Sequence, residues 1–343
     1  MKIWQQLLLL LLLLFLGGCQ GAKREQKRLR EWMAEDGRIK ALATTAMVGE
    51  LVRQVGGERV DLLVLVGEES DPHSYQLVKG DGEKLERADL IFYNGLQLEH
   101  GPSLVAALQD NPKAISLGNL LLEQSPDRFL YVAGQLDPHI WMDISLWNQT
   151  VPFVVQSLTH LDPAHHLFYQ ANGERLQKQL TAAHEEVYQL LQTLPPRLRY
   201  LVTSHDAFNY FGRAYLATPE ELRTNQWHQR IAAPEGLAPE SQLSTVDIAR
   251  ILDHLETFHI RVLFTESNVS KDSIRKIIDA GRQRGLPLQI AAEPLYGDAM
   301  GPPGSNANSY PQMIQSNSQL IYRYLSSGAA KALCADPSPK DPL

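Results

Sequence analysis

The sequence predicts an α/β fold of two lobes, each with a parallel sheet flanked by helices, joined by one long rigid α-helix. Three observations predict it. Apolar, β-branched runs alternate with helical patterns, as in parallel sheets covered by helices. One helical pattern near the middle is far longer than the others, and the alternation resumes after it. The 343 residues, 44% hydrophobic and 21% charged, are enough for two soluble domains of ordinary size.

Residues 1–18 have the pattern of a signal peptide. A basic start precedes an apolar run from Leu7 to Leu16, which is too short for a comfortable membrane-spanning helix. Leu16-Gly17-Gly18-Cys19 then resembles a lipobox, in which the cysteine receives lipid and becomes the new amino terminus. We therefore expect membrane attachment through lipid on Cys19. A plain secretory signal or an uncleaved anchor is the alternative.

Cysteine use and charge exclude some classes of protein. Once Cys19 is lipidated, Cys334 has no partner, so no disulfide is expected to frame the fold. Removal of residues 1–18 removes one lysine and leaves 31 basic against 39 acidic residues, a formal charge of −8. This balance argues against nucleic acid as a partner.

A charged segment and the first lobe follow. Residues 19–38 are dense in Lys, Arg and Glu and are expected to form a solvated tether, although Leu29, Trp32 and Met33 could make a short amphipathic patch. Residues 39–160 are expected to form the N-terminal lobe. Its expected strands are Ile39–Ala43, Val60–Val66, Leu90–Tyr93 and Ala114–Leu117, separated by helical patterns that include Ala46–Val55 and Glu99–Leu108.

Residues 161–195 are predicted to form the connecting helix. Asp162 is a good N-cap and Pro163 a good first residue. Apolar residues then recur at helical spacing with only Gly173 as a weak point; they are Leu176, Leu180, Ala183, Val187, Leu190, Leu191 and Leu194. A helix of this length between two α/β halves indicates a rigid connector in a monomer. The alternative is the seam of a coiled-coil dimer.

The alternation resumes in residues 196–328, the expected C-terminal lobe. Expected strands are Tyr200–Thr203, Arg230–Ala233, Val262–Thr265 and Leu288–Ala292. Expected helices are Ala207–Leu216, Val246–His259, Ser270–Arg284 and Ser309–Leu325. Pro219 to Ser241 is expected to be a loop excursion around one strand. Residues 329–343 carry several prolines and are expected to be disordered.

Three histidines are spaced equally along the chain. His73 and His139 each follow Asp-Pro, His205 follows Ser204, and both intervals are 66 residues. Proline fixes its own φ and keeps the preceding aspartate extended, so each Asp-Pro-His presents its histidine from a stiff loop. Little side-chain freedom is then lost when the imidazole binds a metal ion.

The same histidines lie near expected strand ends, where open α/β sheets bind ligands. His73 and His205 follow strands, Asp298 follows the last strand by a short loop, and His139 lies in the loop after Tyr131-Val132. Two candidates fall in each half, so the predicted site lies in the cleft between the lobes. Three imidazoles and one carboxylate suit Zn(II), Mn(II) or Fe(II), and a full protein shell favours capture over catalysis. Because each ligating histidine must be neutral, mild acid is expected to release the ion.

Other interpretations compete with this one. Eight further histidines are assigned to surfaces or local hydrogen bonds: His100, His160, His165, His166, His184, His228, His254 and His259. A metal-dependent hydrolase would need an open coordination position and a general base, and no His-Glu-x-x-His helix is present. A surface adhesin with a structural metal is the other alternative.

Partners for the ligating imidazoles are predicted as well. Such an imidazole usually donates its other N–H to a carboxylate or carbonyl. Glu266, at a strand end in the same half as His205, is the first candidate, and Asn209 and Asp206 are weaker ones. A helix N-cap or a hydrogen bond between the lobes is an equally good interpretation of Glu266.

With these residues in view, residues 39–325 resemble the metal-binding lipoproteins of bacterial zinc/manganese ABC importers, the solute-binding family with one long backbone helix. The matching stretches are Gly67 to Tyr75, Tyr93 to Glu99, Asp137 to Asp143, Thr203 to Phe211, Phe264 to Asn268 and Leu295 to Met300. The resemblance implies a buried metal between two α/β lobes and places the family's ligand positions on His73, His139, His205 and Asp298. It also implies an extracytoplasmic, lipid-anchored receptor without catalytic activity that serves an ABC permease and its ATPase subunit.

The third ligand position distinguishes subfamilies. Many manganese-selective members carry a glutamate where this chain has His205. Many zinc-selective members carry a histidine-rich loop before the second ligand, whereas Asn119 to Gln135 contains no histidine. The chain is therefore similar to the three-His, one-Asp branch, for which zinc, manganese and iron are all expected cargoes.

Overall fold

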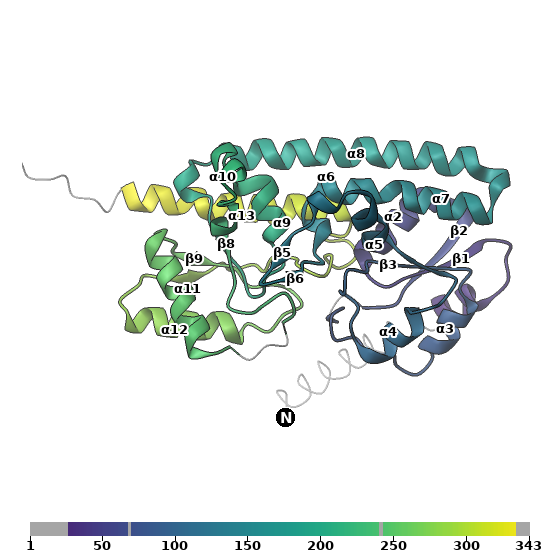
Figure 1. Cartoon of the computed structure of the whole chain (residues 1–343), viewed down its shortest axis with the longest axis horizontal. Helices are drawn as coiled ribbons and strands as arrows, with labels where there is room; N and C mark the ends of the chain where they lie inside the picture. Colours follow the sequence, from purple (N-terminus) through teal and green to yellow (C-terminus); the bar gives the residue numbers. More distant parts are fainter. Residues whose placement is uncertain (1–26, 68–69, 240–242, 334–343) are drawn as a thin grey trace, which may run out of the picture.

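The computed structural model describes residues 27–67, 70–239 and 243–333. Two lobes lie side by side under one long helix (Figure 1). The first lobe is built on a four-stranded parallel sheet of order β2-β1-β3-β4. Its strands are β1 (Ile39–Ala43), β2 (Val60–Val64), β3 (Leu90–Tyr93) and β4 (Ala114–Ser116). A short antiparallel hairpin of β5 (Tyr131–Val132) and β6 (Gln135–Leu136) follows.

The second lobe has shorter strands than the sequence predicts. They are β7 (Leu201–Val202), β8 (Ile231–Ala232), β9 (Val262–Leu263) and β10 (Gln289–Ile290). β7 pairs with β8 and β9 with β10, both in parallel. The Phe264 N–H donates to the Val202 carbonyl at 2.8 Å and joins the two pairs. Each strand therefore leaves the sheet early, and the residues after it are free to form the loops of the site.

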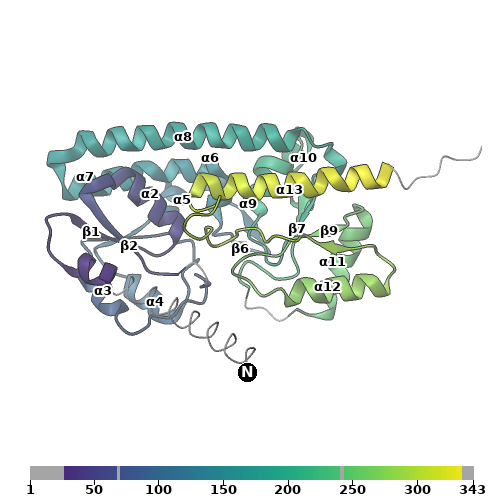
Figure 2. The ribbon, with the colours of Figure 1, turned by 180° about the vertical axis from the view of Figure 1, so that it is seen from behind.

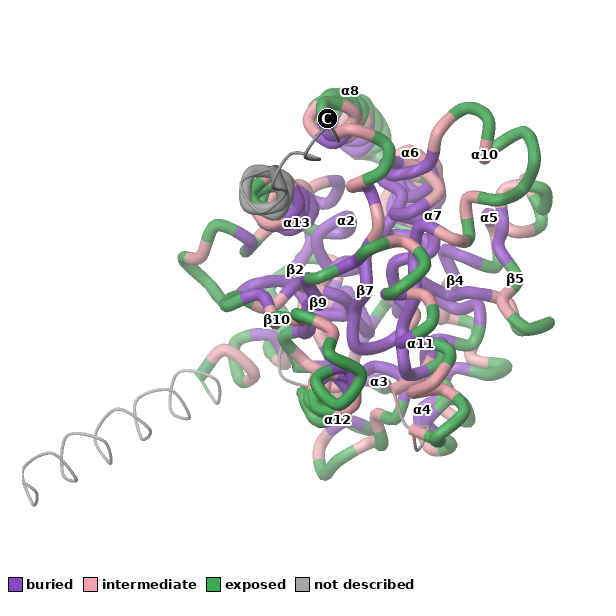
Figure 3. The backbone as a smooth tube through the Cα atoms, turned by 90° about the vertical axis from the view of Figure 1, so that its left-hand side faces the viewer, coloured by how far each residue is buried: buried purple, intermediate pink, exposed green. Residues whose placement is uncertain are grey.

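Helices cover both sheets. In the first lobe they are α2 (Ala46–Gly56), α3 (Asp81–Arg87), α4 (Pro102–Leu108), α5 (Leu117–Gln124), α6 (Ile144–Trp147) and α7 (Val151–Leu161). In the second lobe they are α9 (Asn209–Phe211), the π-helical turn η7 (Gly212–Leu216), α10 (Pro219–Thr224), α11 (Thr245–Thr257), α12 (Asp272–Gln283) and α13 (Tyr310–Leu333). Figure 3 shows the strands mainly in the buried interior, with most of the exposed residues on the outer helices and loops. No helix among the described residues is both long enough and apolar enough to cross a membrane.

The connecting helix is α8 (His166–Gln192), which spans both lobes (Figures 1 and 2). It packs on α2 and α7 of the first lobe and on η7 and α13 of the second. Its buried side chains include Leu176, Leu180 and Val187. A single helix fixed to both lobes along its length resists their rotation, because any hinge motion would have to break this packing.

The start of that helix differs from the prediction. Pro163 begins a separate 3₁₀ turn, Pro163–His165, and α8 begins at His166. Asp162 does not cap the helix backbone. Its carboxylate instead accepts hydrogen bonds from His165 Nδ1 at 2.8 Å and from Tyr169 Oη at 2.8 Å. The local side-chain bonds compete with the cap that Asp-Pro would otherwise form.

Several other expectations are wrong. Helix α10 lies where a loop excursion was expected. α13 continues to Leu333, so residues 329–333 are helical, and residues 334–343 lie outside the described residues. Part of the expected tether is packed on the first lobe. Trp32 is fully buried, and its Nε1–H donates to the Asp61 carbonyl at 2.9 Å. Cys19 and the signal-peptide segment lie outside the described residues.

Candidate metal centre

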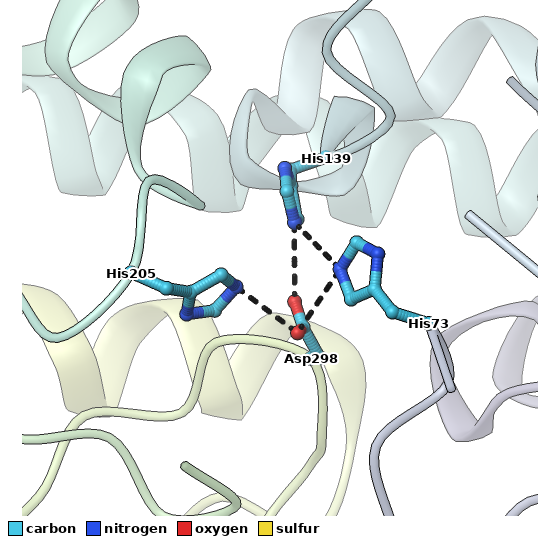
Figure 4. Close-up of side chains that lie close together, drawn as sticks. All are labelled: His73, His139, His205 and Asp298. Atoms are coloured by element: carbon cyan, nitrogen blue, oxygen red, sulfur yellow. Dashed lines mark hydrogen bonds and ion pairs between the residues drawn. The ribbon is translucent and has the colours of Figure 1, made fainter. Parts of the chain in front are cut away.

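The four predicted ligands meet at one point between the lobes (Figure 4). His73 lies in the turns that follow β2, and His139 immediately precedes the 3₁₀ turn Ile140–Met142. His205 is the third residue after β7, and Asp298 lies in the loop after β10. One nitrogen or oxygen atom from each side chain lies within 4.8 Å of all the others.

The distances between these atoms are those of ligands that share one ion. His73 Nε2 lies 3.3 Å from His139 Nε2, and His205 Nε2 lies 3.1 Å from Asp298 Oδ2. The distances from Asp298 oxygens to His73 Nε2 and His139 Nε2 are both 3.5 Å. Two ligands placed tetrahedrally, each about 2.0–2.1 Å from an ion, lie roughly 3.3–3.4 Å apart. A single small cation therefore fits at the centre of the four.

Burial of the four ionisable side chains is energetically unfavourable when no cation is bound. His139 and His205 are 0% exposed, His73 1% and Asp298 4%. Among the described residues, the ion pairs of the Asp298 carboxylate are with the three site histidines, at 3.1–3.5 Å, and no other group donates a hydrogen bond to it. A buried carboxylate needs a positively charged partner, and an imidazole supplies a positive charge only when it is protonated. A bound cation would satisfy both oxygens.

The pKa shifts in the cluster favour an ionised Asp298 and a protonated His205 when no metal ion is bound. Burial raises the pKa of Asp298, but the His205, His73 and His139 imidazoles oppose it and hold that pKa well below its usual range. Burial lowers the pKa of His205, but the Glu266 and Asp298 carboxylates outweigh it and raise that pKa well above its usual value. In the metal-free protein, Asp298 is therefore ionised and His205 carries a proton that a metal ion would displace.

Asp137 orients His139. Asp137 Oδ1 accepts the His139 backbone N–H at 2.9 Å and lies 2.7 Å from the ring nitrogen Nδ1. Asn209 Nδ2 in turn donates to Asp137 Oδ2 at 3.0 Å. With Nδ1–H donated to the carboxylate, Nε2 has its lone pair directed at the site. The sequence analysis missed this role of Asp137, although an aspartate two residues before the ligand is a common local turn acceptor.

Glu266 orients His205 in the way that Asp137 orients His139. Its Oε1 accepts the His205 backbone N–H at 2.9 Å, and its Oε2 lies 2.7 Å from His205 Nδ1. Of the three predicted partners, Glu266 thus touches a candidate ligand, and Asn209 acts one step away through Asp137. Asp206 makes no ion pair with a candidate ligand among the described residues.

A hydrogen bond from a side chain to the backbone ties the ligand loops of the two lobes together. Trp141, two residues after His139, donates its Nε1–H to the carbonyl of Gly297 at 3.0 Å. Gly297 precedes Asp298, and a Cβ at this position would overlap Glu266 Oε2. The glycine is therefore what allows the Asp298 loop and the carboxylate behind His205 to approach each other so closely.

The chain is similar to known metal-binding proteins. The ZnuA family model, described as "Zinc-uptake complex component A periplasmic", matches residues 42–324. The chain belongs to the ZnuA family. It is 38% identical over 257 residues to the metal-binding protein YtgA of Chlamydia pneumoniae, covering 75% of this chain and 78% of that one. It is 31% identical over 298 residues to the zinc-binding protein TroA of Treponema pallidum, covering 84% and 89%.

Solved structures of this family share the fold. Fe(III)-bound YtgA from Chlamydia trachomatis superposes with a TM-score of 0.79 at 34% identity, covering 84% of this chain and 98% of that one. Periplasmic TroA from Treponema pallidum gives a TM-score of 0.76 at 29% identity, covering 84% and 99%. The predicted family resemblance and the predicted two-lobe α/β fold are confirmed.

Proposed function

We propose that this chain is an extracytoplasmic lipoprotein that captures one divalent transition-metal ion between its lobes and delivers it to an ABC permease. The proposed ligands are His73, His139, His205 and Asp298. One observation carries the proposal: four buried ligand atoms lie within 4.8 Å of one another in a member of the ZnuA family. The buried carboxylate of Asp298, which the surrounding imidazoles hold at a pKa well below its usual range, supplies the negative charge that a cation needs.

Zinc, manganese and iron are the proposed cargoes. Three imidazoles and a carboxylate accept all three ions and lack the thiolates that would select Cu(I). The names of similar proteins cover the same range. TroA is named as zinc-binding, MntA of Bacillus subtilis, 29% identical over 293 residues, as manganese-binding, and one YtgA structure as Fe(III)-bound.

Capture rather than catalysis is proposed because of the donor set. Catalytic zinc sites keep a position open for water, whereas four protein ligands fill a tetrahedral shell. The relatives named above are described as metal-binding proteins, and none of them is named as an enzyme. We therefore propose no catalytic residue for this chain.

Its attachment and partners follow from the same family membership. We propose lipid attachment at Cys19 after removal of residues 1–18, a monomeric protein, and docking to a permease and its ATPase subunit. We assign residues 39–160 and 196–328 to the two lobes. The packing of α8 on both lobes supports small lobe motions on metal binding.

Metal analysis of protein purified without added metal, followed by competition among the three ions, tests this function. The expected result is one ion per chain. Asp298→Ala should lose affinity because it removes the only carboxylate among the proposed ligands. Protein that takes up no ion under these conditions, or an Asp298→Ala variant that binds metal as tightly as the wild type, would contradict the proposal.

A further inference from the structure

The buried position of the four ligands raises the question of how an ion reaches them. One recess of about 570 Å³ reaches the cluster on its His73 side. Its lining combines the first lobe, the β5–β6 hairpin and the second lobe, and includes His73, Gln97, His100, Tyr131, Gln135 and Leu237. We call this recess the vestibule. Of the proposed ligands, His73 is the one that lines it.

A second histidine lies in the vestibule beside His73. The ring centroids of His73 and His100 are 5.5 Å apart. This separation falls within the range found inside the cluster, where His73 lies 5.3 Å from His139 and 6.1 Å from His205. Unlike those three, His100 is exposed to solvent.

The tautomer of His100 suits metal binding. Its Nδ1 lies 3.2 Å from the carbonyl oxygen of Gln97, which can only accept a hydrogen bond. The proton therefore sits on Nδ1, and Nε2 keeps a free lone pair. The carbonyl thus prepares His100 for ligation in the way that the Asp137 carboxylate prepares His139.

The backbone that carries His100 is held in an unfavourable conformation. Gly95, Leu96 and Gln97 have φ angles of +78°, +55° and +66° in succession, and two of these residues are not glycine. The buried carboxylate of Glu99 holds this turn by accepting the backbone N–H groups of Asn94 at 2.9 Å and Gly95 at 3.0 Å. Such strain persists only where the surroundings enforce it, and it is concentrated at functional sites.

We propose that His100 and His73 form an outer metal site in the vestibule. A partly hydrated divalent transition-metal ion binds there to two imidazoles and water before His73 carries it into the four-ligand site. This inference rests on the proposed function. Two imidazoles bind more weakly than four ligands that include a carboxylate, so the ion passes through the outer site and does not stay there. Because His100 is absent from the final shell, it changes the rates of loading and release without changing the affinity.

Stopped-flow zinc binding to the purified protein tests the outer site, with release measured by excess chelator. His100→Ala should slow loading and release by the same factor. The factor is about tenfold if His100 stabilises the transition state between the outer site and the four-ligand site by roughly 1.4 kcal/mol. The equilibrium Kd should stay unchanged. His100→Asp, which supplies a carboxylate oxygen ligand in place of the imidazole nitrogen, should recover part of both rates.

The matched control is His228→Ala. His228 is also exposed, and its Nδ1 lies 2.9 Å from a carbonyl three residues earlier, that of Asn225, but it does not line the vestibule. The zinc loading and release rates of His228→Ala should equal those of the wild type. Normal rates in folded His100→Ala would overturn the outer site and leave the proposed function intact. A raised Kd in His100→Ala would also overturn it, because His100 would then belong to the final shell. Wild-type protein that binds no zinc would overturn both proposals.

Discussion

Replacing Glu266 with glutamine tests whether the carboxylate behind His205 sets the metal affinity. Glu266 is fully buried and uses both oxygens on one residue, accepting the backbone N–H of His205 at 2.9 Å and facing its Nδ1 at 2.7 Å. Glutamine has the same shape but only one acceptor oxygen. In Glu266→Gln the amide NH₂ must therefore face one of two N–H donors.

The expected loss follows from that contact. A hydrogen bond to a charged group contributes about 1.5–3 kcal/mol, which corresponds to about a 10–150-fold change in Kd. The general cost of removing a partner of a ligating histidine, about 10–100-fold in metal affinity, falls in the same range. We therefore expect Glu266→Gln to weaken zinc binding by one to two orders of magnitude, measured by competition with a chelator of known affinity.

The control for this prediction is Glu293→Gln. Glu293 is an exposed glutamate in the same lobe, paired with Arg323 at 2.6 Å. Its replacement should leave zinc affinity unchanged. Urea unfolding of both metal-free variants shows whether the fold is intact. If folded Glu266→Gln binds zinc as tightly as the wild type, the carboxylate does not support His205 and the reasoning is refuted.

Three further predictions follow from other contacts. Gly297→Ala should weaken zinc binding by about tenfold, because overpacking typically costs about 1–3 kcal/mol and the new methyl group displaces Glu266 from His205. The same competition titration measures this loss of affinity. An unchanged zinc affinity would show that the methyl group does not displace Glu266. Metal binding at pH 7 should release about one proton, because the pKa of His205 is raised well above its usual value in the metal-free site. Affinity should then rise with pH by about tenfold per unit, and calorimetry in buffers of different ionisation enthalpy detects the proton; binding without proton release would argue against a protonated His205. Asp61→Asn should destabilise the protein by about 1–3 kcal/mol in urea unfolding, because Lys40, Arg28 and Arg38 lose the buried carboxylate that they share. Lys40 keeps Asp36 at 3.0 Å, so it is not left without a partner. A loss below about 0.5 kcal/mol would show that the Asp61 carboxylate does not stabilise the fold.

The sequence predicted which four side chains lie close together better than it predicted the helices around them. His73 and His139 follow Asp-Pro, and His205 lies near a strand end. These local patterns are enough to predict where the three histidines lie, because they do not depend on distant contacts. The strands of the first lobe could also be predicted, because short continuous apolar runs between polar segments are typical of buried strands. Whether the four residues act as ligands stays a prediction that the experiments above address.

The missed features depend on contacts made far along the chain. α7 begins with Val-Pro-Phe, and its polar residues lie only in its second half, from Gln156 to His160, so no polar face repeats along the whole segment. Trp32 lies in a charged segment, and its burial depends on the Asp61 carbonyl, 29 residues away. The sequence predicts Asp137 only as part of the stiff loop before His139, because its second role, orienting the ring of His139, depends on the folded backbone.

The most direct test of the account is X-ray absorption spectroscopy at the zinc edge on protein loaded with one ion. We expect three imidazole nitrogens and a carboxylate oxygen at about 2.0–2.2 Å, with one imidazole fewer in His139→Ala. A shell made mainly of water oxygens, a sulfur ligand, or the same imidazole number in His139→Ala would contradict the claim that these four side chains hold the ion.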